Sequence, residues 1–247
     1  MALLEARDIH VRFGDRVVLE EISFAVEPAE LHGIMGPNGA GKTTFFNVLT
    51  GRVKPSRGTV SLAGEDVTGL PPHAIAAQGI ARSFQVMTLF DEFTARENVE
   101  VALPEFRARG FDAARAAIGD LAFAEAADAV LAQVGLAEKG DVVAKDLPYG
   151  ERRALEIAVA LAQRPRVLCL DEPTSGLGSD GVARLARLVA SLKGRLAIVA
   201  IEHDMDFLFA LADRISVVHW GQVIARGTPA ELRANAWVQR SNLGRLQ

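Results

Sequence analysis

The chain has 247 residues, of which 49% are hydrophobic and 23% are charged, and its formal net charge is −4. These values are typical of a globular chain that buries a core without disulfides, and they exclude intrinsic disorder as the main state. The mild acidity argues against a general nucleic-acid-binding surface, and no stretch approaches the roughly 20 apolar residues of a transmembrane helix. The first residues lack the pattern of a secretory leader, so we expect a cytoplasmic protein.

Alternating apolar and polar residues predict strands at the beginning of the chain. Residues 3–13 and 22–26 follow the two-residue period of half-buried strands, which predicts an antiparallel β layer. A short apolar run at 31–35 leads through a glycine-rich loop into a helix predicted over 42–49, which stops at Gly51. This order of strand, loop and helix is the context that a phosphate-binding loop requires.

The middle of the chain has a different composition. Alanine-rich segments with helical spacing and few β-branched residues occur between 94 and 162, and they predict an inserted helical subdomain. After residue 166, strand-like and helix-like segments alternate, which predicts parallel strands joined by crossover helices. The last two strands should form a hairpin around Gly221, and a final helix should open at Pro229. We therefore predict an α/β fold with a mostly parallel core sheet, an N-terminal antiparallel β subdomain and an inserted α-helical subdomain.

A glycine-rich motif follows the third predicted strand. Residues 36–43 fit the pattern G-x-x-x-x-G-K-[ST] at every fixed position. Glycines let the backbone wrap closely around a triphosphate, while successive N–H groups and the helix N-terminus face the anion. The lysine brings charge to the outer phosphates, and the following hydroxyl is suited to Mg²⁺. The motif predicts a nucleotide triphosphate site built from Gly36, Pro37, Asn38, Gly39, Ala40, Gly41, Lys42, Thr43 and Thr44.

Two adjacent carboxylates follow the buried strand predicted over 167–170. Asp171 would lie at the carboxyl end of this strand, within reach of the magnesium coordination shell. Glu172 would then be placed to polarise an attacking water. Solvated acids that merely end a strand are the alternative interpretation, and the presence of Lys42 weighs against it.

With these residues in place, the chain resembles an ATP-binding-cassette (ABC) ATPase over its whole length. The segment Pro148-Tyr149-Gly150-Glu151 begins a helix and is similar to the family's signature sequence, which contacts the ATP of the opposite subunit. The resemblance implies one P-loop NTPase domain of ABC type over 1–247, with a nucleotide-binding core at 1–86 and 163–247 and a helical signature subdomain at 87–162. It also implies that the protein binds ATP with Mg²⁺ and hydrolyses it.

The resemblance implies roles for residues whose own signal is weak. Phe13 falls where the family stacks an aromatic ring on adenine, although by itself a core phenylalanine is the simpler interpretation. Gln85 matches the glutamine that links Mg²⁺ and water to the transport partner, and His203 matches the histidine that contacts the γ-phosphate. The expected catalytic residues are thus Lys42, Glu172 and His203, and the expected magnesium ligands are Thr43, Gln85 and Asp171.

Within the family, the chain is most similar to the ATPase subunits of branched-chain amino-acid importers. The ATPase of lipopolysaccharide export is a near relative on the same segments and is the alternative. The resemblance implies a second ATPase subunit, identical or related, membrane permease subunits and, indirectly, a periplasmic or extracellular substrate-binding protein. It places the chain on the inner face of the membrane, with no nucleic-acid partner. The similarity is carried by Phe45–Gly51, Gly79–Gln85, Asn98–Val99, Arg153–Ile157, Ile201–Met205 and Gly227–Pro229.

Two residues depart from the family pattern. Pro148 replaces the signature serine, whose hydroxyl would reach the γ-phosphate held by the opposite subunit. A lost hydrogen bond to a charged group is worth about 1.5–3 kcal/mol, so weaker ATP-driven closure is expected. Proline in the first turn of a helix is otherwise well tolerated. Gly178 stands where the family usually has Asp or Asn, and the two changes leave open a regulatory module that binds nucleotide and hydrolyses it weakly.

Overall fold

The computed structural model describes residues 2–83, 89–108, 121–235 and 238. Within these residues, one sheet has four strands in the order β2-β1-β4-β5 and a second has six strands in the order β10-β9-β3-β8-β7-β6. The strands are β1 Leu4–Phe13, β2 Arg16–Val26, β3 Leu31–Met35, β4 Arg57–Leu62, β5 Glu65–Asp66, β6 Ile80–Arg82, β7 Val167–Asp171, β8 Ala197–Ile201, β9 Arg214–His219 and β10 Gln222–Gly227.

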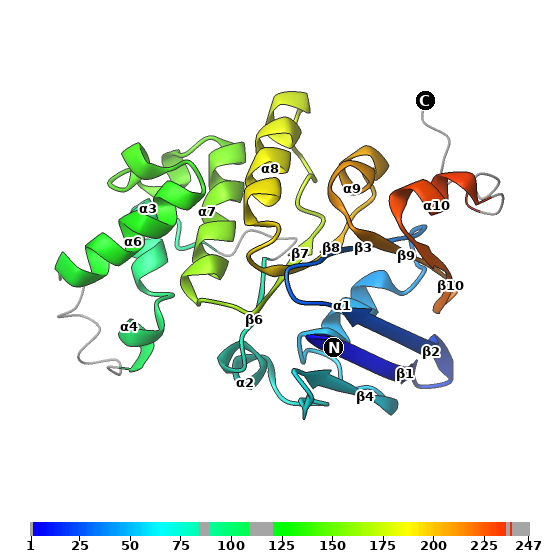
Figure 1. The fold of residues 1–247 in the computed structure, drawn as a ribbon. Coiled ribbons are helices and arrows are strands. Elements are labelled where there is room, and N and C mark those ends of the chain that lie inside the picture. The colour runs from blue at the N-terminus through cyan, green and yellow to red at the C-terminus, as the bar shows by residue number, and fades with distance from the viewer. Residues whose placement is uncertain (1, 84–88, 109–120, 236–237, 239–247) are drawn as a thin grey trace.

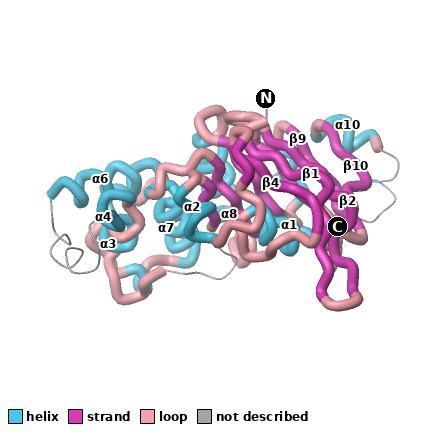
Figure 2. Tube along the Cα trace, turned by 90° about the horizontal axis from the view of Figure 1, so that it is seen from below, coloured by secondary structure: helices cyan, strands magenta, loops and turns pink. Residues whose placement is uncertain are grey.

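Helices flank the six-stranded sheet and also form a separate group (Figure 1). In Figure 2, α3, α4 and α6 lie at one end of the molecule and the antiparallel strands lie toward the other. The helices are α1 Lys42–Leu49, α2 Pro72–Ala77, α3 Ala95–Glu100, α4 Pro104–Ala108, α6 Leu121–Gln133, α7 Tyr149–Ala162, α8 Ser179–Leu192, α9 Met205–Leu211 and α10 Pro229–Ala234, with short 3₁₀ turns at Ala137–Lys139 and Ala144–Asp146.

The six-stranded sheet is the buried centre of the molecule. Its strands β9, β3, β8, β7 and β6 pair in parallel, and β10 pairs antiparallel with β9. Strands β7 and β8 are buried along their whole length because both faces are covered. Leu168 and Leu170 pack on the side of α7, α8 and α9, whereas Val167 and Cys169 pack on the side of α1 and the four-stranded sheet. Figure 1 shows these two coverings on opposite sides of the sheet.

The antiparallel layer supports the first helix of the core. Strand β1 pairs antiparallel with both β2 and β4. Phe45 and Phe46 of α1 share a core cluster with Leu4 and Ile9 of β1. This packing fixes α1 between the two sheets, so the loop that precedes it is held on both sides.

The predicted α/β fold, with its parallel core and antiparallel N-terminal strands, is confirmed. Strand β6 covers Ile80–Arg82, and residues 109–120 of the region with predicted helices lie outside the described residues. The boundaries of the helical subdomain at 87 and 162 stay a prediction, although α3, α6 and α7 do contact one another.

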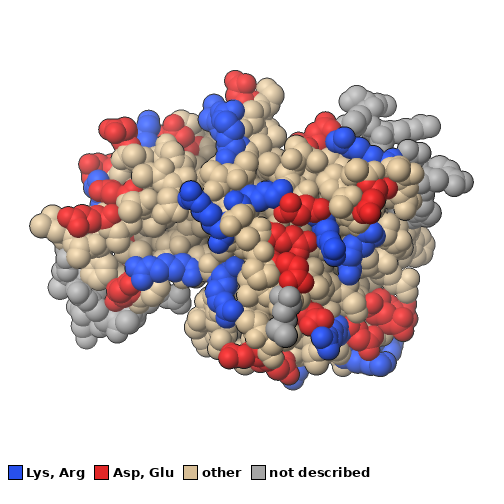
Figure 3. Space-filling model, viewed as in Figure 1, with Lys and Arg blue, Asp and Glu red and all other residues tan. Residues whose placement is uncertain are grey.

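The surface carries charges of both signs. Lys and Arg side chains are interspersed with Asp and Glu over the face seen in Figure 3, in keeping with 27 basic and 31 acidic residues in the chain. Over the described ranges, the structure has no helix with the length and apolar character needed to span a membrane.

Candidate nucleotide-binding site

The loop between β3 and α1 is shaped by glycines in close contact with neighbouring backbone. A Cβ atom added at Gly36 would lie only 2.0 Å from the carbonyl oxygen of Val218, so no larger residue fits there. Gly41 has a φ of 99°, a left-handed conformation that favours glycine, and it is the N-cap of α1 without a side-chain cap. The first turn of α1 also has no acidic residue. The helix N-terminus therefore keeps its amide groups and positive dipole end for an anion.

Lys42 is the buried charge of this loop. Its ammonium group donates hydrogen bonds to the carbonyls of Gly36 at 2.7 Å and Pro37 at 3.0 Å. Burial lowers the pKa of Lys42, while the charges of Glu172 and Asp171 act in the opposite direction. The loop therefore holds a partly desolvated cation that attracts an anion. The two nearby carboxylates repel an anion unless a divalent cation lies between them and it.

A pocket of about 340 Å³ brings most of the predicted site together. It is open on one side, and the Phe13 ring on its wall is 54% exposed, as a ring available for stacking on a base should be. Loop residues 38–44 thus share one cavity with Phe13, Glu172 and His203, which are far apart in sequence. Gly36 and Pro37 are not in the lining of this pocket. The pocket is lined by Phe13, Arg16, Val18, Asn38, Gly39, Ala40, Gly41, Lys42, Thr43, Thr44, Glu172 and His203.

Asp171 is held at the end of β7 by a buried arginine that the sequence analysis did not identify. Arg82 of β6 forms an ion pair with Oδ2 of Asp171. It also donates to Asn47 Oδ1 of α1 at 2.7 Å and to Oγ1 of Thr50, the C-cap of α1, at 3.0 Å. Its guanidinium carbon also lies 5.0 Å from the centroid of the Phe46 ring. Arg82 thus joins the carboxylate to the helix of the phosphate loop. A cation in a short strand of the central sheet is the sequence signal that could have identified it.

The other oxygen of Asp171 supports the expected magnesium site. Its Oδ1 atom is buried and has no hydrogen-bond partner among the described residues. A buried carboxylate oxygen without a partner is costly unless a ligand completes it. Carboxylate and hydroxyl oxygens are the donors that Mg²⁺ prefers, so Asp171 and Thr43 fit this ion. Gln85, the third expected ligand, lies outside the described residues.

Glu172 and His203 form a direct pair at the mouth of the pocket. His203 Nε2 lies 2.6 Å from Glu172 Oε1. Glu172 has a φ of 45°, and a non-glycine residue in this region is strained by about 1–3 kcal/mol. The Glu172 amide donates to the Ile201 carbonyl at 2.9 Å, which ties the strained turn to the end of β8. Such strain at the point where a carboxylate enters a pocket is typical of a functional turn.

The turn after β7 is also held from the side of α7. Arg153, 1% exposed, donates to the carbonyls of Glu172 at 2.8 Å and Pro173 at 3.1 Å. It also forms an ion pair with Glu156 at 2.7 Å. Arg153 belongs to a segment that carries the family resemblance, and no role was predicted for it. The sequence signal that could have identified it is a pair of opposite charges, Arg153 and Glu156, among the mostly apolar buried positions of α7.

The signature-like segment lies outside the pocket. Pro148 is the N-cap of α7, with a φ of −54°, and the helix begins at Tyr149. The Tyr149 hydroxyl donates to the Ser175 carbonyl at 3.1 Å, and the Tyr149 side chain is exposed. The described part of the pocket lining contains none of residues 148–151. Within one chain, this segment and the phosphate loop are therefore separate surfaces.

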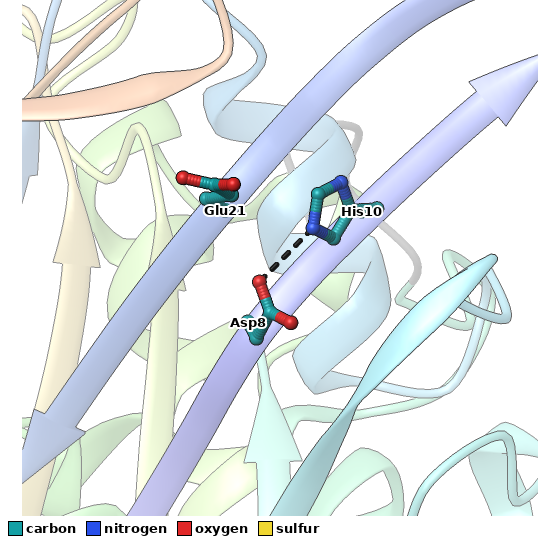
Figure 4. A group of neighbouring side chains, drawn as sticks. All are labelled: Asp8, His10 and Glu21. Carbon is teal, nitrogen blue, oxygen red and sulfur yellow. Dashed lines mark hydrogen bonds and ion pairs between the residues drawn. The ribbon is translucent and has the colours of Figure 1, made fainter.

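A second group of titratable side chains lies in the four-stranded sheet. Figure 4 shows Asp8 and His10 from β1 and Glu21 from β2 pointing toward one another, with ligand atoms all within 4.8 Å. His10 Nε2 lies 3.0 Å from Asp8 Oδ1, and Arg57 lies 3.0 Å from Asp8 Oδ2. Both oxygens of Asp8 are thus engaged within the protein, so we interpret this group as polar pairing at the sheet surface.

Known proteins similar in sequence to this chain are ATP-binding proteins of ABC transporters. The sequence model of the ABC transporter family matches residues 19–175. The high-affinity branched-chain amino acid transport ATP-binding proteins BraF of Pseudomonas aeruginosa and LivG of Escherichia coli are each 38% identical over 249 residues, covering 98% of this chain and 98% of their own. The lipopolysaccharide export ATP-binding protein LptB of Acidithiobacillus ferridurans is 32% identical over 98% of this chain and 97% of its own.

The fold of a solved structure agrees with these sequence matches. The ADP conformation of MJ1267, an ATP-binding cassette of an ABC transporter, matches with a TM-score of 0.86 and 27% identity, over 99% of this chain and 100% of that chain.

Proposed function

Because the chain belongs to the ABC transporter family and is an ATPase, we propose that it energises the uptake of branched-chain or related amino acids. The observation that carries this proposal is the pocket in which the phosphate loop meets Glu172 and His203. Relatives with 38% identity over 98% of the chain are named for branched-chain amino acid transport, whereas the lipopolysaccharide-export relative is 32% identical. Amino-acid import is therefore favoured over lipopolysaccharide export.

ATP binding is assigned to the loop and the pocket wall. The amides of residues 38–44 and the Lys42 ammonium group bind the phosphates, and the adenine stacks on Phe13. Thr43 and Asp171, together with Gln85, would hold Mg²⁺, which when bound polarises the phosphoryl oxygens as a Lewis acid. The buried Oδ1 of Asp171 supports this assignment because it has no hydrogen-bond partner among the described residues.

Hydrolysis is assigned to the pair at the mouth of the pocket. Glu172 orients the attacking water and accepts a proton from it. The water oxygen forms a bond to the γ-phosphorus while the bond between this phosphorus and the leaving oxygen of ADP breaks. His203, 2.6 Å from Glu172, contacts the γ-phosphate and fixes the rotamer of the carboxylate. Lys42 stabilises the charge that develops on the phosphoryl oxygens.

Each ATP would be shared between two chains. In the proposed head-to-tail dimer, residues 148–151 of one copy cover the ATP held by the phosphate loop of the other copy. Their separation from the pocket within one chain supports this arrangement. The γ-phosphate supplies contacts that ADP lacks, so ATP closes the dimer and hydrolysis reopens it. The permease converts this motion into transport, and it keeps the chain at the inner face of the membrane.

The test is reconstitution with the native partners. The chain is isolated with its associated membrane proteins, placed in vesicles, and supplied with the co-purified substrate-binding protein. We expect leucine, isoleucine or valine to stimulate ATP hydrolysis, and a matched sample that carries Glu172→Gln to stay at background. Stimulation by lipopolysaccharide in place of amino acids, or equal hydrolysis with and without the membrane partner, would contradict the proposal.

A further inference from the structure

Glu202 is a buried carboxylate that serves three backbone amides. It follows β8 directly and is 2% exposed. One oxygen accepts a hydrogen bond from the Thr174 amide at 2.7 Å, and the other accepts from the amides of His203 at 3.0 Å and Asp204 at 3.3 Å. Burial raises the pKa of Glu202, and these backbone hydrogen bonds act in the opposite direction. The Thr174 side chain also hydrogen-bonds to Glu202 and lowers its pKa. The protein keeps a costly acidic group here, and its partners lie in two loops.

These contacts continue the pairing of β7 and β8 beyond the end of both strands. The last register pair between the two strands is Asp171 with Ile201. Beyond this pair, the segment after β7 leads to Thr174 and the segment after β8 leads to His203. The Glu202 side chain crosses the gap and binds both segments at once. It therefore sets how far the loop that carries Glu172 lies from the loop that carries His203.

The same turn is held on its opposite side by Arg153. The guanidinium group donates to the carbonyls of Glu172 and Pro173, as described above. Arg153 thus fixes the carbonyls of the turn to α7, and Glu202 fixes the next amide, that of Thr174, to the end of β8. Glu202 also accepts from the amides of His203 and Asp204, so it contacts both segments that carry the Glu172–His203 pair.

We infer that Glu202 is a positioning residue for ATP hydrolysis, which acts by holding Glu172 and His203 at their working separation. This inference rests on the proposed roles of those two residues. Their side chains meet at 2.6 Å, and a displacement of about 1 Å in a reacting group lowers a rate by about 10²-fold. A carboxylate is required because it offers acceptors on both oxygens, whereas an amide has one acceptor oxygen and a donor NH₂ group. Glutamine at this position would release the Thr174 loop or the His203 loop.

The experiment compares Glu202→Gln with a matched substitution at another buried carboxylate. Glu100 of α3 is also 2% exposed and burial raises its pKa, so Glu100→Gln removes an equally buried charge away from the pocket. For full-length wild type and both variants, we measure kcat, the dissociation constant for MgATP and the thermal unfolding midpoint. We expect Glu202→Gln to lower kcat by about 10- to 100-fold with MgATP affinity nearly unchanged, and Glu100→Gln to keep wild-type kcat.

A wild-type kcat for Glu202→Gln would overturn the inference, and so would equal losses of kcat in the two variants, because these would indicate general destabilisation. If Glu202→Gln does not fold, Glu202→Asp replaces it. This variant keeps the charge but spans a shorter distance, so kcat should fall with MgATP affinity retained, and an unchanged kcat would again overturn the inference. Glu172→Gln is assayed in parallel. Loss of turnover there with full turnover in the Glu202 variant refutes the positioning role alone, whereas full turnover in Glu172→Gln refutes the proposed catalytic role.

Discussion

His203 and Glu172 contact each other across the ends of two neighbouring strands, with 2.6 Å between Nε2 and Oε1. The contact is possible because β7 and β8 are adjacent and end in register at Asp171 and Ile201. A carboxylate paired with an imidazole at the opening of a phosphate-binding pocket is suited to orient water and to sense the terminal phosphate.

Removing the charge of Glu172 should separate binding from hydrolysis. Glu172→Gln keeps the shape of the side chain but removes the proton acceptor, so we expect turnover to fall by at least about 10²-fold while MgATP still binds. The ATP-bound dimer should then accumulate, which gel filtration with and without MgATP detects. Unchanged hydrolysis would remove Glu172 from the mechanism.

Restoring a hydroxyl at the N-cap of α7 should strengthen the dimer. In Pro148→Ser, the new hydroxyl can contact the γ-phosphate held by the opposite subunit, and such a bond to a charged group would tighten ATP-driven dimerisation by about tenfold or more. Sedimentation of Glu172→Gln chains, with and without Pro148→Ser, measures the dimer dissociation constant in MgATP. Pro72, at the start of α2, provides the control substitution Pro72→Ser. Weaker or unchanged dimerisation in Pro148→Ser would refute this role.

Buried His32 should make stability depend on pH. Its Nε2 lies 2.9 Å from Ser216 Oγ and its Nδ1 lies 3.5 Å from Glu30. Burial lowers the pKa of His32, with Arg226 and Arg214 adding to this effect and Glu30 opposing it. The unfolded chain therefore takes up this proton at a higher pH, near about 6.5, than the folded chain does. Stability should fall as the pH drops below that value and through the folded pKa.

Thermal unfolding between pH 8 and pH 5 tests this expectation. His32→Gln should flatten the pH dependence of the unfolding midpoint, whereas His73→Gln, at an exposed histidine, should keep the wild-type slope. If His32→Gln retains the full slope, other groups determine the acid sensitivity of the fold.

Local sequence patterns were sufficient to predict the fold and the location of several residues of the candidate site. The phosphate loop and the strands around it were predicted because glycine spacing and two-residue periodicity are local signals. The acids at the end of β7 followed from the same logic, since the carboxyl ends of parallel strands meet at one edge of a sheet.

The groups that hold Glu172 and His203 in place could not be predicted in this way. Arg82 reaches Asp171 because β6 lies beside β7, and Glu202 reaches Thr174 because β8 lies on the other side of β7. These contacts depend on strand order and register, which are set by packing between segments far apart in the chain. The functional roles of Glu172, His203 and Gln85 stay predictions, because a fold does not by itself determine the chemistry of a site.

Binding of MgATP to Lys42→Ala tests the central claim most directly. The alanine variant loses the ammonium group of the loop and therefore its hydrogen bonds to the phosphates. Losing one hydrogen bond between charged groups costs about 1.5–3 kcal/mol, which weakens MgATP binding by at least about tenfold. Calorimetric titration measures the dissociation constant for MgATP of the wild type, of Lys42→Ala and of Lys54→Ala, a control at an exposed lysine. We predict that Lys42→Ala loses MgATP affinity by that factor or more and that Lys54→Ala keeps it. Full affinity in Lys42→Ala would contradict the assignment of this loop as the phosphate-binding site.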